Sequence, residues 1–363
     1  MYSLPTEILQ QVFAETLYTE KTYTTRELYS CILVNRQWCM TGIPILWSHP
    51  FHPDSRILQQ AKLVDIYLSF FMTRNCPEEI ASQPLFKEQQ QNQLYHKIKS
   101  IENTNDSVFV YPYFANTIDF NRMIKTVQLW CILNRITDEI FWDIIAGILI
   151  IMQSNAAIVD RITWPIEAYE GVKLLKILKR YPEIAAWLSH VSSIRLMLGN
   201  FFGSFMDSQT EHLNVAELPQ TLKQLEIDVT KINHFKRHEQ LTTFLEITKK
   251  FECLKYIKIT GPFHEIELLV DALRPSAATL LDISFTKLNC SHYIGLYDLL
   301  EFPNILELSV CGWTESPNNF LSFLSEVKDR NWVITPKYFS IREKLNNDEL
   351  HFDFRFEKNS GVL

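Results

Sequence analysis

The stretch Leu254-Lys255-Tyr256-Ile257-Lys258-Ile259 carries apolar residues at its first, fourth and sixth positions. The last two are separated by one residue, which is the spacing of side chains on one buried face of a β-strand. Self-similarity along a chain predicts a stack of structural repeats, each contributing one short strand here. The pattern recurs at intervals of 25 to 35 residues, in Ile124/Val127/Leu129, Val159/Ile162/Trp164, Val191/Ile194/Leu196, Leu222/Leu225/Ile227, Leu254/Ile257/Ile259, Leu280/Ile283/Phe285 and Ile305/Leu308/Val310.

Segments with a helical spacing of apolar residues lie between these predicted strands. They cover residues 138–152, 169–188, 237–251, 264–273, 292–300 and 319–327. Strands that alternate with helices predict parallel strands, because antiparallel neighbours are commonly joined by tight turns. Near the end of the chain, Phe352, Phe354 and Phe356 alternate with polar residues, which predicts a strand over 350–356 that covers the last repeat. The predicted fold class is α/β.

The repeated strand-and-helix pattern resembles leucine-rich repeats, whose stacking builds an α/β horseshoe with the strands on its concave side. Several repeats exceed the usual length of about 20 to 29 residues. The Asn or Cys expected three positions after the last apolar strand residue is also replaced, for example by Glu167, Thr230 and Trp313. The resemblance implies an irregular horseshoe solenoid over residues 123–363.

Side chains between the buried strand positions would project onto the concave face of such a horseshoe. They include aromatic residues and arginines, which anchor partners in many interfaces. Two interpretations stay open: recognition of a protein partner, or charged residues such as Arg195, Glu226 and Lys258 that only pair along adjacent strands. If the partner carries a modified residue such as phosphoserine, Arg161 and Arg195 are the residues expected to contact it. The candidate substrate-binding residues are Trp130, Arg161, Arg195, Glu226, Asp228, Tyr256, Lys258 and Asp282.

The first fifty residues predict three short helices. Leu4-Pro5 opens the first, because proline is favoured at the first helical position, and apolar residues follow at helical spacing. Thr24 and Glu27 have the spacing of a capping box at the start of the second. The second helix is expected to carry Leu28, Cys31, Ile32, Val34 and Trp38. A third apolar stretch covers 43–47, and helices this short cannot bury their apolar surface within roughly 50 residues, so part of it should face a partner or the next domain.

These helices contain one ordered motif: Leu4-Pro5-x-Glu7-Ile8-Leu9-x-x-Val12-Phe13, Leu28-x-x-Cys31-x-x-Val34-Asn35-Arg36-x-Trp38 and Pro44-Ile45-Leu46-Trp47. The motif resembles the F-box, in the form found in the large F-box families of fungi. The resemblance implies that this hook binds a Skp-type adaptor and, through it, a cullin. At its end, directly before the second helix, the loop 18–23 lacks the acidic residue that is common in the family. The implied adaptor-binding residues are Leu4, Pro5, Ile8, Leu9, Val12, Leu28, Cys31, Val34 and Trp38.

Between the hook and the repeats we expect a connector. An amphipathic helix is predicted over 55–72, a polar segment follows over 73–106, and the aromatic segment 109–120 is expected to pack as a cap. The predicted domains are an F-box-like helical hook (1–51), a helical and aromatic connector that forms the N-terminal cap (52–122), and a leucine-rich-repeat-like solenoid with its closing strand (123–363).

The composition of the chain limits the classes of binding partner and the cellular compartments that we expect for the protein. A net charge of -7 disfavours nucleic acid as a partner, since phosphate binding needs clustered Lys and Arg. The longest apolar run, 144–152, is too short to cross a bilayer, which takes about 20 residues, and the chain start carries no visible secretory signal. The 7 cysteines are scattered without paired spacing, which indicates reduced thiols and predicts a cytoplasmic or nuclear protein.

Local signatures of catalysis are missing from the sequence. His234 and His238 have a spacing that could chelate a metal, but no third ligand is indicated, and surface histidines are the expected interpretation. No nucleotide loop, G-x-S-x-G stretch or C-x-x-C pair occurs, so we expect no catalytic, cofactor or metal residues. A hydrolase or other enzyme is the third hypothesis, after the two functions that follow. The predicted function is a non-catalytic substrate-receptor subunit of a Skp–cullin–F-box ubiquitin ligase, with an unknown protein substrate on the solenoid. The alternative is a repeat scaffold whose N-terminal helices only cap the array.

Overall fold

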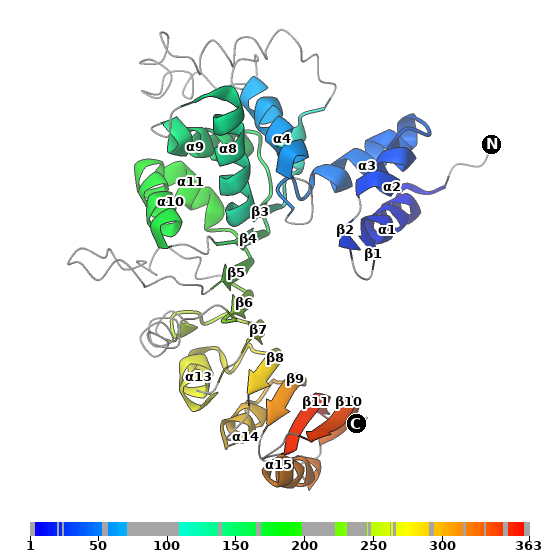
Figure 1. The fold of residues 1–363 in the computed structure, drawn as a ribbon, viewed down its shortest axis with the longest axis vertical. Helices are drawn as coiled ribbons and strands as arrows, with labels where there is room; N and C mark the ends of the chain where they lie inside the picture. Colours follow the sequence, from blue (N-terminus) through cyan, green and yellow to red (C-terminus); the bar gives the residue numbers. More distant parts are fainter. Residues whose placement is uncertain are drawn as a thin grey trace. The chain divides into compact units, whose positions relative to one another are not determined.

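The chain is mixed α/β and divides into two compact units (Figure 1). Unit 1 consists of Met1–Thr163 and Lys173–Leu188, and unit 2 consists of Trp164–Val172 and Ser189–Leu363. The structure is a computed structural model, and it describes residues 4–19, 22–23, 25–52, 57–70, 109–136, 140–164, 168–197, 222–230, 245, 248–261, 263, 266–289, 294–314, 317–329, 332–343 and 348–358.

Unit 1 begins with the helices α1 (Thr6–Leu17), α2 (Thr25–Ile32) and α3 (Arg36–Trp47). The amide of Leu9 donates to the carbonyl of Pro5 at 3.1 Å, so the first helix starts beside the proline as predicted. Between α1 and α2, the short strands β1 (Tyr18–Thr19) and β2 (Thr22–Tyr23) pair antiparallel within the expected loop.

The second helix is shorter than predicted. Asn35 accepts a hydrogen bond from the amide of Trp38 at 3.0 Å and caps a new helix, because an asparagine side chain can satisfy one of the first free amides. Val34 therefore lies between α2 and α3, and Trp38 lies in α3. The prediction that both belong to the second helix was wrong.

A small apolar core joins these three helices. Its buried members are Leu9, Phe13, Leu28, Ile32 and Ile43. Gly42 of α3 lies so close to Ile32 of α2 that an added Cβ would overlap that side chain, which lets the two helices approach closely. The Trp47 ring stacks on Tyr111 of the 3-10 helix η2 (Tyr111–Phe114), with 4.2 Å between ring centroids. Part of the aromatic segment expected to act as a cap thus packs beside this core.

The rest of unit 1 is mainly helical. Its elements are α4 (Ile57–Ser69), β3 (Thr117–Asp119), α8 (Phe120–Asn134), α9 (Phe141–Ser154), β4 (Arg161–Thr163) and α11 (Pro182–Leu188), with most of α10 (Ala168–Arg180). Strands β3 and β4 are parallel. The apolar run 144–152 is a buried part of α9, as predicted. The helix expected over 169–188 is broken at Tyr181, because the residue before a proline is disfavoured in helical conformation.

The first predicted strand, Ile124/Val127/Leu129, is instead part of helix α8. Asp119 caps this helix by accepting from the amide of Arg122 at 2.8 Å. The buried residues follow a helical period. They are Phe120, Met123, Ile124, Val127, Trp130 and Cys131. The three apolar residues are spaced three and two positions apart, which fits both a helix and a strand over so short a window. The triplet alone could therefore not tell a helix from a strand.

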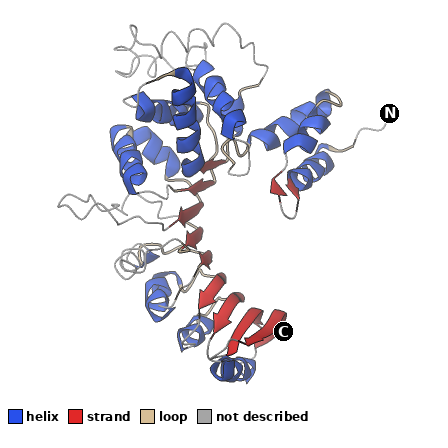
Figure 2. Cartoon of the chain, in the orientation of Figure 1, coloured by secondary structure: helices blue, strands red, loops and turns tan. Residues whose placement is uncertain are grey.

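The other predicted strands are confirmed. Unit 2 contains β5 (Ser193–Met197), β6 (Gln224–Asp228), β7 (Tyr256–Thr260), β8 (Asp282–Asn289) and β9 (Glu307–Thr314), parallel and paired in chain order. Helices α13 (Ile266–Leu273), α14 (Ile294–Leu300) and α15 (Pro317–Asp329) lie along one side of these strands (Figure 2). Buried Leu225, Ile257, Ile283 and Leu308 share one register across the sheet.

The predicted closing strand is confirmed as β11 (Asp348–Lys358), which pairs antiparallel with β9. A further strand, β10 (Trp332–Glu343), pairs with its other edge and was not predicted. Pro336 within β10 suits an edge strand, where a missing amide costs no ladder bond. Most of the helix predicted over 237–251 lies outside the described residues, as do His234, His238 and the polar segment 73–106.

Candidate functional site

Helix α1 separates its apolar residues onto two faces. Leu9 and Phe13 point into the core and are 1% and 0% exposed. Ile8 and Val12, one turn apart on another face, are 44% and 46% exposed, and Leu4 continues this row before the helix begins. We call Leu4, Ile8 and Val12 the α1 stripe. Water-exposed apolar side chains in such a row are typical of a contact surface.

Further exposed apolar residues lie at the α2–α3 junction. The side chain of Gln37 donates from Nε2 to the carbonyl oxygen of Leu4 at 2.9 Å and thereby ties the start of α1 to this junction. Leu33 and Val34, just before α3, are 69% and 60% exposed. The start of the α1 stripe at Leu4 is therefore held beside the first turn of α3.

The implied adaptor-binding residues fall into two groups. Leu4, Pro5, Ile8, Val12 and Val34 are exposed and can be touched directly. Leu9 and Leu28 are buried, Cys31 and Trp38 are partly buried, and these four support the surface from beneath. The Trp38 ring packs edge-on against Phe13, with 5.4 Å between ring centroids.

In unit 2, the strand face opposite the helices is polar. Alternation along each strand places one side chain inward and the next outward, and the paired registers align the outward residues of neighbouring strands. We call this surface the outer strand face. Its outward residues form three described rows, Gln224/Tyr256/Asp282/Glu307/Glu357, Arg195/Glu226/Lys258/Ser284/Ser309/Arg355 and Asp228/Thr260/Thr286/Cys311/Asp353.

Two arginines neutralise part of the negative charge on this face. Arg195 lies 4.0 Å from Glu226 and 4.0 Å from Asp228. Arg355 of β11 lies 2.6 Å from Glu307 and 2.9 Å from Glu357. Arg195 thus pairs with Glu226 of the adjacent strand, as the charge-pairing interpretation expects. Within the described part of the chain, Lys258 forms no ion pair.

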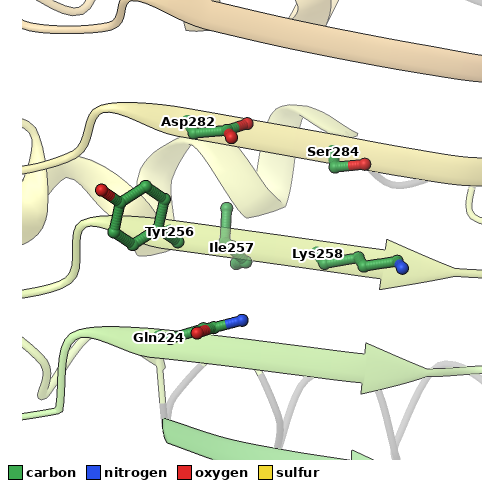
Figure 3. Close-up of a pocket in the computed structure, with 6 residues that line it drawn as sticks. All are labelled: Gln224, Tyr256, Ile257, Lys258, Asp282 and Ser284. Atoms are coloured by element: carbon green, nitrogen blue, oxygen red, sulfur yellow. The ribbon is translucent and has the colours of Figure 1, made fainter. Parts of the chain in front are cut away.

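An open hollow of about 250 Å³ lies on the outer strand face. It is lined by Gln224, Tyr256, Ile257, Lys258, Asp282 and Ser284 (Figure 3). Partial burial raises the pKa of the Asp282 carboxyl group, the Glu307 carboxylate raises it further, and the Arg355 guanidinium offsets part of this rise. The hollow thus combines an aromatic ring, an ammonium group and a carboxyl group that resists ionisation.

The predicted substrate-binding residues do not all belong to this face. Glu226, Asp228, Tyr256, Lys258 and Asp282 lie on it, with Arg195 on the first of its strands. Trp130 is a correction: it is 1% exposed in α8, and its Nε1 donates to Asp65 at 2.8 Å, so it cannot meet a partner. Arg161 is exposed in β4 of unit 1, outside the face described here.

Several residues of the face were missing from the predicted site, among them Arg355 and Gln224. Arg355 follows from the alternation of Phe352, Phe354 and Phe356, which places the residue between the last two outward. Gln224 directly precedes the first buried residue of β6, so the same alternation of inward and outward side chains could have identified it. This alternation could not predict that Arg355 contacts Glu307, because the contact depends on how β11 aligns with β9.

Metal and membrane features are as follows. In the described ranges, no group of three His, Cys, Asp or Glu side chains is placed to hold a metal ion. None of the helices in the described residues combines the length and the apolar character needed to cross a bilayer.

No protein-family model matches the chain, and a search of curated proteins finds no match either.

Proposed function

We propose that the chain is a substrate-receptor subunit of a Skp–cullin–F-box ubiquitin ligase. The three N-terminal helices act as an F-box and dock a Skp-type adaptor, and the strands of unit 2 act as an irregular leucine-rich-repeat solenoid that holds a protein substrate. The mechanism is positional: a receptor that binds both raises the effective concentration of a substrate lysine near the ubiquitin-charged enzyme. The receptor itself transfers no proton or acyl group.

The observation that carries the proposal is the two-sided character of α1. Leu9 and Phe13 already fill the core, yet Ile8 and Val12 remain in water on the other face. Burial of apolar surface contributes about 25 cal/mol per Å², so a partner that covers this row gains binding free energy. The sequence resemblance to the F-box, in the same residues, supports a Skp-type adaptor as that partner.

The test is co-purification of the full chain with a Skp-type adaptor. We expect a one-to-one complex, and we expect Ile8→Glu with Val12→Glu to weaken it about tenfold or more, because charges would enter an apolar contact. Both residues are exposed, so the folded chain should tolerate the change. Leu9→Ala is a poor substitute, since it opens a cavity in the core.

Leu321→Glu is the matched control, because Leu321 is an exposed apolar residue of α15 in unit 2. It should leave adaptor binding unchanged. A chain that stays monomeric beside the adaptor at micromolar concentration would refute the proposal and favour the scaffold whose helices only cap the repeats. Equal binding by the double variant and the wild type would also refute it.

A further inference from the structure

One row of the outer strand face is unusually acidic. Gln224, Tyr256, Asp282, Glu307 and Glu357 stand side by side on consecutive strands, and no cation belongs to the row. Arg355, from the neighbouring row, reaches only two of the three carboxylates, at 2.6 Å for Glu307 and 2.9 Å for Glu357. The third carboxylate, Asp282, has no ion-pair partner among the described residues.

Lys258 does not fill this gap. It lies two positions after Tyr256 on β7, and in Figure 3 its ammonium group points along the strand, away from Asp282. Partial burial and the Glu307 carboxylate raise the pKa of Asp282, and Arg355 offsets only part of this rise, so the ionised Asp282 carboxylate still meets repulsion from Glu307. A guest cation beside Asp282 would remove this repulsion.

The Tyr256 ring supplies the second element of a cation site. Tyr256 is 44% exposed, and it stands next to Asp282 at the same end of the two strands (Figure 3). A cation over an aromatic ring is attracted by the ring's electron-rich face, and a neighbouring carboxylate adds a charged hydrogen bond. The two groups together fit the ammonium or guanidinium group of a long side chain.

We propose that the hollow at Tyr256 and Asp282 binds a Lys or Arg side chain of the substrate protein. Charge complementarity supports this occupant, because carboxylates outnumber cations at the described outward positions of β5 to β9 and β11. The carboxylates are Glu226, Asp228, Asp282, Glu307, Asp353 and Glu357, and the cations are Arg195, Lys258 and Arg355. The inference rests on the proposed function only in taking the bound molecule to be the substrate protein.

The probe is the peptide acetyl-Gly-Gly-Arg-Gly-Gly-amide, titrated into the full chain by ligand-observed NMR. Its partner probe has citrulline in place of arginine, which keeps the shape and removes the charge. We expect a millimolar Kd for the arginine peptide, roughly fivefold or more below that of the citrulline peptide. Equal affinities for the two peptides would overturn the proposal.

Variants locate the binding. Asp282→Asn and Tyr256→Leu should each weaken the arginine peptide several-fold, with unchanged thermal unfolding midpoints as the check on folding. Asp353→Asn, on β11 of the same face, is the matched control and should bind like the wild type. A loss at Asp353→Asn as large as at Asp282→Asn would overturn the proposal, since it would indicate attraction to the general field of the face.

The peptide titration needs no adaptor, so the two proposals fail separately. Loss of adaptor binding with intact arginine binding would remove the F-box assignment and leave this site standing. Intact adaptor binding without arginine preference would overturn the site alone.

Discussion

At the scale of single residues, the outward positions of the strands could be predicted, but their charge balance could not. Alternation with Ile257 and Ile283 places Tyr256 and Asp282 on the outer strand face from sequence alone. Which carboxylate lacks a counter-ion depends on Arg355, about seventy residues further along the chain. An ion pair between residues so far apart in the sequence depends on which strands are neighbours in the sheet, and the local sequence pattern does not predict this order.

His49, just after α3, makes the stability of unit 1 sensitive to pH. Burial, the largest cause, and the nearby His52 and Arg161 together lower the pKa of His49 from 6.5 to about 4. The unfolded chain therefore binds a proton at His49 more readily than the folded chain does. By linkage, the free energy of unfolding should fall as the pH drops from about 6.5 to about 4, by at most about 3 kcal/mol from this group.

Replacing His49 by glutamine should flatten this dependence. The measurement is the thermal unfolding midpoint at pH 7 and at pH 4.5, where the variant should lose less stability than the wild type. His190→Gln, at an exposed histidine after α11, is the matched control. An unaltered pH dependence in the His49 variant would show that this side chain does not carry the effect.

At the scale of elements, strands β5 to β9 could be predicted because each repeats the same spacing of apolar residues. Helix α8 could not, because Ile124, Val127 and Leu129 fit either period, and the deciding residues lie outside that triplet. Asp119 at its start and Trp130 against Asp65 of α4 fix it as a helix. Strand β10 was missed because it carries no repeat, although its β-branched and aromatic residues are typical of a strand.

Strands β8 and β9 continue past an irregularity that requires a glycine. The pairing shifts between Thr286 and Leu288, and Lys287 between them has a φ of 64°. Gly312 of β9 approaches this point so closely that an added Cβ would overlap the carbonyl oxygen of Leu288. A side chain at 312 would therefore force the two strands apart.

Gly312→Ala should destabilise unit 2 by about 2 kcal/mol or more, since backbone atoms must move to relieve the overlap. Chemical denaturation followed by circular dichroism measures the change. Ser309→Ala, at an outward position of the same strand, is the control and should cost much less. Similar losses for the two variants would mean that β8 and β9 are not held this closely.

At the scale of the whole molecule, the two surfaces belong to different units. The α1 stripe lies in unit 1 and the outer strand face in unit 2, so each can be altered without touching the other. A receptor needs this separation, because adaptor and substrate must be bound at the same time. Substitutions at Ile8 and Val12 should therefore spare arginine-peptide binding, and Asp282→Asn should spare the adaptor.

Amide hydrogen exchange of the full chain, with and without a Skp-type adaptor, tests this division most directly. The adaptor should slow exchange in α1 and at the α2–α3 junction, while strands β7 to β9 exchange as in the free chain. Slowed exchange in those strands with none in α1, or no change anywhere at saturating adaptor, would contradict the account.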